Sequence, residues 1–375
     1  MAKPRHLVIC ENNLALVSSL LLRIGGKMSG PADIMFTDAL DFSPAINYLT
    51  NQDCGLFDNV WRVETRSLVT STIRKSRQER RRITLNPEAF MPIPFNRERY
   101  TDLWLNLDSL CPKYYYYCLV NRGDRPAVHF VEEGNSSYFM DLSTLKTDCI
   151  DHDHFKEGCF KDNCKDIWLS QTKLYQPDTV ALEVRQLPKT AFDDSRLSAF
   201  MSAVFKKNDI PKQRYIFFEQ CNIEDGYITN DLELVNEIAS IVGRENMVIR
   251  LHPRTKEDRF KPLGYTTICN ENSLWEADLM GAVDQIADKV LISIESTAVF
   301  TPLIMFDSPV RSVVLDKIVW GSYKNRYNKE KCAYIDALEQ LSNKTTLRCF
   351  RPSTLDELRI YFDFLVRMND GGSCK

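Results

Sequence analysis

The stretch HLVICENNLALVSSLLLRIGG, residues 6–26, decides the fold because it joins a strand pattern to a helix pattern. Residues 6–10 form a short, mostly apolar run of the kind that buried strands have. After a polar gap, apolar residues recur at helical spacing until Gly25-Gly26 ends the helix. These residues are Leu14, Val17, Leu20 and Leu21. A strand, a short loop and a helix are how a Rossmann-like domain begins.

Further strands are expected in the first half of the chain at residues 34–37, 59–63 and 127–131. Segments of helical period separate them, a pattern typical of parallel sheets covered by helices. The last strand ends directly on Glu132-Glu133-Gly134. Because catalytic groups of open α/β sheets gather at the carboxyl ends of strands, this acidic pair is a candidate for the functional site.

A second series of strands and helices begins after the polar stretch 206–212, which contains a proline. An apolar helical stripe ends at Gly243 and separates the first two strands of this series. The expected strands are residues 215–218, 247–251, 290–294 and 311–315. The second half therefore repeats the organisation of the first.

Two Rossmann-like halves predict an α/β fold of the GT-B type, in which two such domains face a central cleft. We expect the first domain at residues 1–195 and the second at residues 196–352. Residues 353–375 begin with a capping box that runs from Ser353 through Asp356 and continue as an amphipathic helix. This last helix is free to cross back to the first domain.

The composition limits the classes of protein to which the chain can belong. Its 375 residues are 44% hydrophobic with mixed charge, as expected of a folded protein of two domains. A net charge of −3 gives no reason to expect bulk attraction to nucleic acid, and no nucleic-acid partner is predicted. Neither an export signal nor a membrane-spanning run is expected, and the 12 scattered cysteines indicate reduced thiols. These features predict a cytoplasmic protein.

The residues best suited to chemistry are Glu132-Glu133-Gly134 and His252-Pro253, each of which follows a predicted strand, one in each half. Transfer of a sugar from a nucleotide to a hydroxyl needs a base for that hydroxyl and a group that neutralises the departing phosphate. A carboxylate suits the first task, and a histidine with Arg254 beside it suits the second. The alternative is two ordinary surface turns, since either short motif alone is weak.

In these residues the chain resembles the bacterial sialyltransferases of glycosyltransferase family 52, which include lipooligosaccharide sialyltransferases, and the related polysialyltransferases. Those families share an acidic-acidic-Gly motif, a His-Pro motif and a later Ser-Ser or Ser-Thr pair. Here the matches are Glu132-Glu133-Gly134, His252-Pro253 and Ser296-Thr297, in the same order. By these motifs the resemblance spans residues 130–300. Elsewhere it rests only on the alternation of predicted strands and helices.

The resemblance implies a role for each motif. Glu132 is the preferred general base, and its neighbour Glu133 either is the base or positions it. His252 contacts or protonates the phosphate of the departing CMP. Ser296 and Thr297 hold that phosphate through hydroxyl hydrogen bonds.

Four further residues are expected at the CMP donor, namely Gln220, Pro253, Arg254 and Glu276. Glu276 resembles the carboxylate that these families place against the ribose hydroxyls, although a glutamate at a helix start is also a common structural residue. No cofactor and no metal are expected beyond the donor substrate CMP-sialic acid. His252 and the Ser296-Thr297 hydroxyls would take the place of a divalent ion.

The predicted function is inverting, metal-independent transfer of sialic acid, or a related nonulosonic acid, from CMP to a cell-surface glycan such as lipooligosaccharide or capsule. The first domain would be the acceptor side and the second the nucleotide-sugar side. One alternative has the same fold but a different reaction. The protein would then be either a hexosyltransferase that uses a UDP-sugar or a CDP-polyol phosphotransferase, in surface polysaccharide synthesis. Another is a catalytically silent glycan-binding or nucleotide-binding protein.

Three other clusters contain residue types that are found in functional sites. Glu224-Asp225-Gly226 repeats the acidic motif but lies on the donor side, so the earlier triplet is assigned to catalysis. Asp151-His152-Asp153 matches a metal-binding Asp-x-Asp motif that chance also produces in a chain of this composition. The third cluster has the chemistry of zinc ligands without a familiar spacing, so a metal-free loop is preferred. Its residues are His152, His154, Cys159 and Cys164.

One dense basic run lies between residues 74 and 82, with Glu79 inside it. Such runs are usually solvated helix faces. The functional alternative is attraction to anionic lipid headgroups or to a phosphorylated glycolipid acceptor at the inner face of the cytoplasmic membrane. The basic residues are Arg74, Lys75, Arg77, Arg80, Arg81 and Arg82. A homodimer is expected from the family resemblance alone.

Overall fold

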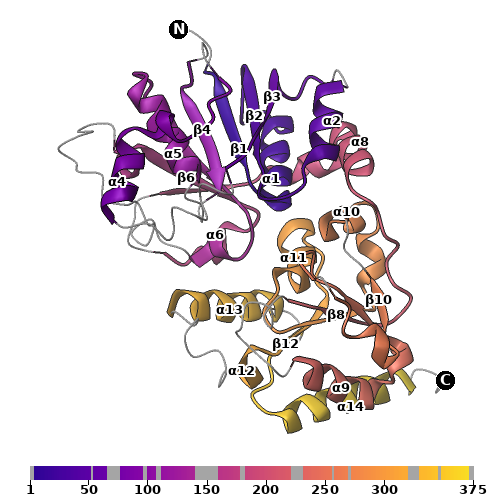
Figure 1. The fold of residues 1–375 in the computed structure, drawn as a ribbon. Coiled ribbons are helices and arrows are strands. Elements are labelled where there is room, and N and C mark those ends of the chain that lie inside the picture. The colour runs from indigo at the N-terminus through magenta and orange to yellow at the C-terminus, as the bar shows by residue number, and fades with distance from the viewer. Residues whose placement is uncertain are drawn as a thin grey trace. The chain divides into compact units, whose positions relative to one another are not determined.

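A computed structural model describes residues 4–51, 54–65, 77–95, 99–106, 111–139, 159–177, 182–220, 231–255, 257–268, 272–319, 329–344 and 348–370. By its internal contacts the chain divides into two compact units, Met1–Val204 and Phe205–Lys375. We call them the N-terminal unit and the C-terminal unit. Each contains a parallel sheet with helices packed on it (Figure 1).

The N-terminal unit is built on a sheet whose seven described strands pair in parallel, in the order β3-β2-β1-β4-β5-β6-β7. The chain moves outward from β1 to β3 and then starts again at β4 on the other side of β1. The strand order therefore reverses between β1 and β4, which makes this pair the topological switch point. The strands are β1 (His6–Cys10), β2 (Ala32–Thr37), β3 (Asn59–Val63), β4 (Asp102–Asn106), β5 (Ala127–Val131), β6 (Cys164–Leu169) and β7 (Glu183–Gln186).

Right-handed crossovers place the helices that follow β1 and β2 on the opposite face from the helix that follows β4. Accordingly, α1, α2 and α8 pack together, whereas α4 packs on α5 (Figure 1). The helices are α1 (Asn13–Ile24), α2 (Ser43–Asn51), α4 (Arg77–Leu85), α5 (Cys111–Asn121), α6 (Ser136–Phe139) and α8 (Ser195–Val204). Short 3₁₀ turns are η1 (Pro87–Ala89), η4 (Lys161–Asn163), η5 (Thr172–Leu174) and η6 (Lys189–Asp193).

The opening strand and helix lie where the sequence predicts them. The side chain of Asn12 caps α1 by accepting a hydrogen bond from the Ala15 main-chain N at 2.7 Å. The helix ends before Gly25, and a Cβ at that position would lie 2.4 Å from the Cγ of Pro188. Glycine is therefore needed here so that the end of α1 can approach the chain before η6.

The boundary between the units differs from the predicted division at residue 195. Helix α8 buries Leu197, Phe200 and Met201, and the ring of Phe200 packs edge-on against Tyr48 of α2 at 5.3 Å. Because these apolar side chains belong to the core of the N-terminal unit, that unit extends to Val204. The periodicity of apolar residues in α8 does not by itself show to which unit the helix belongs.

The C-terminal unit repeats the arrangement with six described strands, all paired in parallel, in the order β10-β9-β8-β11-β12-β13. Its strand order reverses between β8 and β11. The strands are β8 (Tyr215–Phe218), β9 (Met247–Arg250), β10 (Thr266–Ile268), β11 (Val290–Ser293), β12 (Arg311–Val314) and β13 (Cys349–Phe350). The switch point of this unit therefore lies at the carboxyl ends of β8 and β11.

The described helices of the C-terminal unit cover both faces of this sheet. They are α9 (Asp231–Val242), α10 (Trp275–Leu279), α11 (Thr301–Phe306), α12 (Asp316–Val319), α13 (Lys329–Ser342) and α14 (Leu355–Asp370). Short 3₁₀ turns are η7 (Arg244–Asn246), η8 (Lys261–Leu263), η9 (Val283–Ile286) and η10 (Thr297–Val299).

The last helix belongs to the core of the C-terminal unit, which corrects the expectation that it crosses back. Helix α14 packs against α9, and Leu358 and Phe362 join the same buried cluster as Leu234 and Ile238. Its N-terminus is capped one residue later than predicted, since the Thr354 hydroxyl accepts a hydrogen bond from the main-chain N three residues on. Apolar packing on α9 explains why the helix stays in this unit.

The predicted fold class, an α/β protein with two Rossmann-like domains, is confirmed by the two parallel sheets and their switch points. Among the described residues, no helix combines the length and the apolar character that crossing a bilayer would require.

A buried charged network lies on the strands of the N-terminal unit. The ring of His129 places Nδ1 2.7 Å from an Asp166 carboxylate oxygen and Nε2 3.0 Å from an Asp102 carboxylate oxygen. Trp104 stacks on the ring with centroids 4.3 Å apart. Burial alone would lower the pKa of His129, but the two carboxylates outweigh it and raise that pKa. The two carboxylates therefore favour the charged form of the imidazole.

We expect the His129→Gln variant to lose roughly 3 kcal/mol of unfolding free energy, because it removes the cation between the buried carboxylate of Asp166 and the half-buried carboxylate of Asp102. The raised pKa means that the contribution of His129 is full below its ordinary pKa of about 6.5 and is lost as the pH rises through the folded value. Urea denaturation should therefore show a larger loss at about pH 6 than at about pH 9.

His6→Gln is the matched control. Burial lowers the pKa of His6, so its contribution is present above the ordinary pKa and fades only on the acid side. Its effect should not shrink toward alkaline pH. Equal losses for His129→Gln at both pH values would contradict the charged state of His129.

Candidate functional site

The predicted acidic motif lies beside the switch point of the N-terminal sheet. Glu132 and Glu133 directly follow β5, while Asn106 ends β4 and Asn12 lies two residues after β1. The next residue, Gly134, has φ of +142°, a conformation that residues with a side chain rarely adopt. The glycine therefore permits the sharp turn predicted after the acidic pair.

Glu133 is aimed at the switch point because two amides hold its carboxylate. Its Oε2 accepts a hydrogen bond from Asn106 Nδ2 at 2.7 Å and lies 3.4 Å from Asn12 Nδ2. Its main-chain N donates to the hydroxyl of Ser137 at 3.0 Å. The residue is half-buried, whereas Asn106 is almost fully buried. The carboxylate is thus fixed to the end of β4 and the start of α1.

Glu132 has a different environment, although it is the adjacent residue. It is 1% exposed, and its two oxygens accept hydrogen bonds from the Tyr138 hydroxyl at 2.9 Å and the Ser170 main-chain N at 2.6 Å. Burial raises its pKa above the ordinary value. The sequence-based preference for Glu132 as the base does not fit this geometry, because both carboxylate oxygens accept hydrogen bonds from buried groups of the protein. The geometry favours Glu133, the alternative left open.

In the C-terminal unit, Gln220 joins the two strands of the switch point. It follows β8, and its Oε1 accepts hydrogen bonds from the Glu295 main-chain N at 2.9 Å and the Ser293 hydroxyl at 3.3 Å. The Ser293 hydroxyl also accepts from the main-chain N of Ser296 at 2.8 Å. Gln220 therefore fixes the course of the chain as it leaves β11 for the Ser-Thr pair.

Ser296 and Thr297 form the start of a 3₁₀ turn and are both half-buried. The Ser296 hydroxyl caps η10 by accepting from the Ala298 main-chain N at 3.3 Å. The hydroxyl of Thr301 lies 3.3 Å from both the Thr297 carbonyl oxygen and Oε1 of Glu276. Glu276 is 7% exposed, so it is tied to the Ser-Thr turn from the inside. Its contact with a ribose stays a prediction.

His252 lies two residues beyond β9 in a tight loop. Its Nδ1 accepts a hydrogen bond from the main-chain N of Arg254 at 3.1 Å. In the neutral ring the proton is therefore on Nε2, which makes that nitrogen a donor suited to a phosphate oxygen. The ring is half-buried, and Pro253 and Arg254 are exposed.

A buried carboxylate holds the His252 loop in place. Glu219, the last residue before Gln220, is 3% exposed and accepts from the His252 main-chain N at 3.1 Å and the Thr255 hydroxyl at 2.6 Å. Arg259 donates to Glu219 at 2.9 Å and pairs with Asp231 at 2.6 Å. The two carboxylates outweigh the opposing effect of burial and raise the pKa of Arg259, which stays charged.

The structure thus brings most of the predicted donor residues together. Gln220, Ser296, Thr297 and Glu276 are joined by direct hydrogen bonds or by one bridging side chain. The main-chain N of His252 donates to Glu219, which is the residue before Gln220. The acidic pair lies in the N-terminal unit, at an equivalent switch point.

Sequence reasoning missed several residues that organise these sites, namely Asn12, Asn106, Glu219, Asp231, Arg259 and Lys331. Lys331 in the first turn of α13 forms an ion pair of 2.6 Å with Glu295, next to the Ser-Thr pair. Asn12 and Glu219 are polar residues just after predicted strands, a signal that could have identified them. The others come from elements that the sequence patterns did not connect to the site.

Some predicted clusters lie outside the described residues. They are Glu224-Asp225-Gly226, Asp151-His152-Asp153, His154, Arg74 and Lys75. Cys159 and Cys164 are described and are free thiols. Within the described ranges, no group of three or more His, Cys, Asp and Glu side chains is placed to bind a metal.

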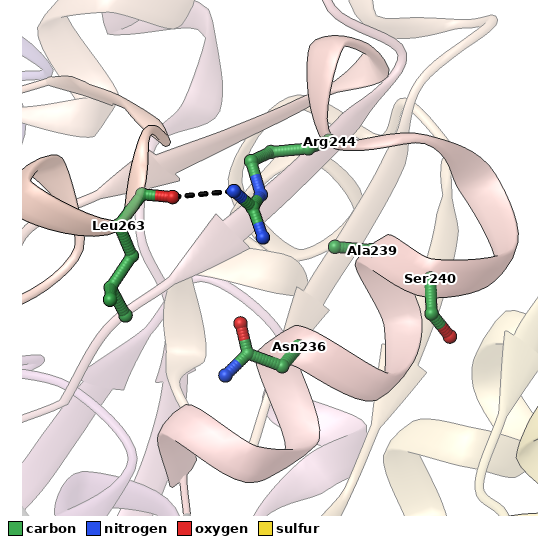
Figure 2. Close-up of a pocket in the computed structure, with 5 residues that line it drawn as sticks. All are labelled: Asn236, Ala239, Ser240, Arg244 and Leu263. Carbon is green, nitrogen blue, oxygen red and sulfur yellow. Dashed lines mark hydrogen bonds between the residues drawn. The ribbon is translucent and has the colours of Figure 1, made fainter.

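A separate cavity of about 540 Å³ lies between α9 and η8 of the C-terminal unit (Figure 2). Arg244 reaches into it and donates to the Leu263 carbonyl oxygen at 2.6 Å. The turns η7 and η8 precede β9 and β10, so this cavity lies near the amino ends of those strands. None of the predicted site residues lines it. The cavity is therefore distinct from the switch-point site.

We expect Glu219→Ala to lower the unfolding free energy of the C-terminal unit by roughly 3 kcal/mol, since it removes one of the two carboxylates bound to Arg259 and leaves the half-buried His252 main-chain N and Thr255 hydroxyl without this acceptor. The ¹⁵N shifts of the His252 ring should also move toward a mixture of tautomers as the loop is released. Glu245→Ala is the control, because Glu245 is an exposed carboxylate in η7. Unchanged His252 shifts in the Glu219 variant would refute the positioning role.

The chain was compared with known proteins. No family model and no curated protein matches it. Among solved structures it is similar to Phytolacca americana UGT2 complexed with UDP-2fluoro-glucose and pterostilbene (TM-score 0.47, 11% identity, covering 98% of this chain and 89% of that one). UDP-N-acetylglucosamine 2-epimerase from Rickettsia bellii gives a TM-score of 0.43 at 12% identity, covering 98% of both chains. ADP-heptose lps heptosyltransferase II from E. coli gives 0.37 at 9%, covering 98% and 99%.

Proposed function

We propose that the chain is an inverting glycosyltransferase that moves sialic acid, or a related nonulosonic acid, from CMP to a hydroxyl of a cell-surface glycan. One observation carries the proposal: each Rossmann-like unit fixes one of the two required groups at the carboxyl edge of its sheet. Glu133 is oriented by two amides, and His252 by the loop that Glu219 anchors. The order of the motifs along the chain supports the donor class.

Glu133 is the proposed base for the acceptor. Asn106 and Asn12 contact Oε2 and the Ser136 hydroxyl lies 3.5 Å from Oε1, and because each carboxylate oxygen can accept more than one hydrogen bond, the hydroxyl of an acceptor sugar can bind beside them. As that hydroxyl oxygen bonds to the anomeric carbon, its proton passes to Glu133. The bond from the anomeric carbon to the phosphate oxygen breaks, and its electron pair leaves with CMP. Attack from the face opposite CMP inverts the anomeric configuration.

His252 and the Ser-Thr pair are the proposed stabilisers of the departing phosphate. Nε2–H of His252 and the hydroxyls of Ser296 and Thr297 can donate to its oxygens as negative charge develops there. Arg254 adds a cation in the same loop. The proposal assigns this work to the protein itself, without a metal ion.

The decisive catalytic test compares the two adjacent glutamates with CMP-sialic acid as donor and a panel of galactosides and sialosides as acceptors. Glu133→Gln should lower kcat about 10²–10⁴-fold while CMP binding is kept, since the base is lost and the fold is not. Glu132→Gln should chiefly lower stability, because that carboxylate serves the core. The reverse order of kcat losses, measured by mass spectrometry of products, would refute Glu133 as the base.

Thermal shift with CMP, CDP and UDP tests the donor class. A ligand at a hundred times its dissociation constant adds about 2.7 kcal/mol. Each kcal/mol raises the Tm of a domain of this size by roughly 2–4 °C, so the expected shift is about 5–11 °C. CMP should raise the Tm most, and His252→Ala should reduce the shift. A larger shift with UDP would replace the proposal by a hexosyltransferase, and one with CDP by a polyol phosphotransferase.

A further inference from the structure

A cavity of about 600 Å³ lies between α4 and η1 in the N-terminal unit, and none of the residues assigned to the switch-point sites lines it. Its lining combines two guanidinium groups and one carboxylate, that of Glu79, with amide and apolar side chains. The other lining residues used below are Gln78, Arg81, Arg82, Leu85, Ala89 and Phe90. Helix α4 is labelled in Figure 1 beside α5.

The lining follows from the helical repeat. Residues 78, 81, 82 and 85 are spaced i, i+3, i+4 and i+7, so they share one face of α4. The opposite face is anchored, since Ile83 and Thr84 are buried and Asn121 of α5 donates to the Leu85 carbonyl oxygen at 3.4 Å. The cationic face is therefore held outward by a packed core, and Arg81 and Arg82 are both exposed.

The floor of the cavity is apolar. The guanidinium of Arg82 lies over the ring of Phe90, with the centroid 5.9 Å away, and Ala89 and Leu85 continue the same surface. A ligand that fits must therefore present negative charge at its head and carbon-rich surface directly behind it. An inorganic anion would use only the first property, and a nucleic-acid backbone would leave the apolar floor uncovered.

Positive charge is concentrated in this region of the sequence. Six of the nine residues from 74 to 82 are Arg or Lys, whereas the whole chain has a net charge of −3. A bilayer with anionic headgroups attracts such a cluster at short range, and the attraction falls within a Debye length. A helix with one cationic and partly apolar face is suited to lie at the level of the headgroups.

We propose that the cavity between α4 and η1 docks the protein on an anionic phospholipid surface. Arg81 and Arg82 would bind the headgroup phosphates, and Leu85, Ala89 and Phe90 would contact the glycerol and the first acyl carbons. This inference does not depend on the proposed reaction, because it concerns where the protein binds and not what it transfers.

The test is sedimentation of the full chain with vesicles of pure phosphatidylcholine or of equal parts phosphatidylcholine and phosphatidylglycerol. Wild type should bind the anionic vesicles only, less so at high salt. Arg81→Ala combined with Arg82→Ala should weaken binding about 30-fold, the effect of two cations at such a surface. Phe90→Ser should weaken binding without changing its salt dependence.

The matched control is Lys206→Ala combined with Lys212→Ala, which removes two exposed cations of the C-terminal unit and should leave binding unchanged. Circular dichroism checks that each variant is folded. Three outcomes would overturn the proposal: no preference for anionic vesicles, an equal loss in the lysine control, or tighter binding of a single-stranded oligonucleotide or inorganic phosphate than of vesicles.

Discussion

Parallel pairing of one central strand on both of its sides is the constraint on which the rest of each unit depends. β1 pairs with β2 and β4, and β8 pairs with β9 and β11. Right-handed crossovers then send the following helices to opposite faces, so the chain diverges at the carboxyl ends of the central pair. Polar residues can occupy that divergence without disturbing the core. Gln220 lies at this position in the C-terminal unit, and in the N-terminal unit the carboxylate of Glu133 reaches it from the neighbouring strand β5.

Much of the fold was predictable because its central strands are apolar and its helices amphipathic. Strands β4, β6 and β7 escaped prediction, since Asp102, Asp166 and Arg185 interrupt the apolar pattern. These charges are tolerated because they neutralise one another around His129, which no sequence window reveals. Helix α5 is a similar case. Its four consecutive tyrosines are all buried, so it has no polar face that would mark it as a helix.

The candidate site was predictable in composition but not in geometry. Each motif does follow a strand, as predicted. The sequence, however, preferred Glu132 to Glu133, and these two residues differ only in the direction in which each side chain leaves the chain after β5. The amides that orient Glu133 come from positions 27 and 121 residues away. The carboxylate that fixes His252 lies 33 residues upstream of it. Such partners become neighbours only when the sheet forms.

The network around His129 has a consequence for how this protein can diverge during evolution. Loss of one member weakens the compensation of the charges that remain: without His129, Asp166 keeps Arg185 as its cation, and without either aspartate the imidazole keeps the other one. Replacement of the whole group by apolar residues of similar volume can preserve a stable core. Substitutions at Asp102, His129 and Asp166 are therefore coupled, so the residue at one position limits which residues the other two positions tolerate.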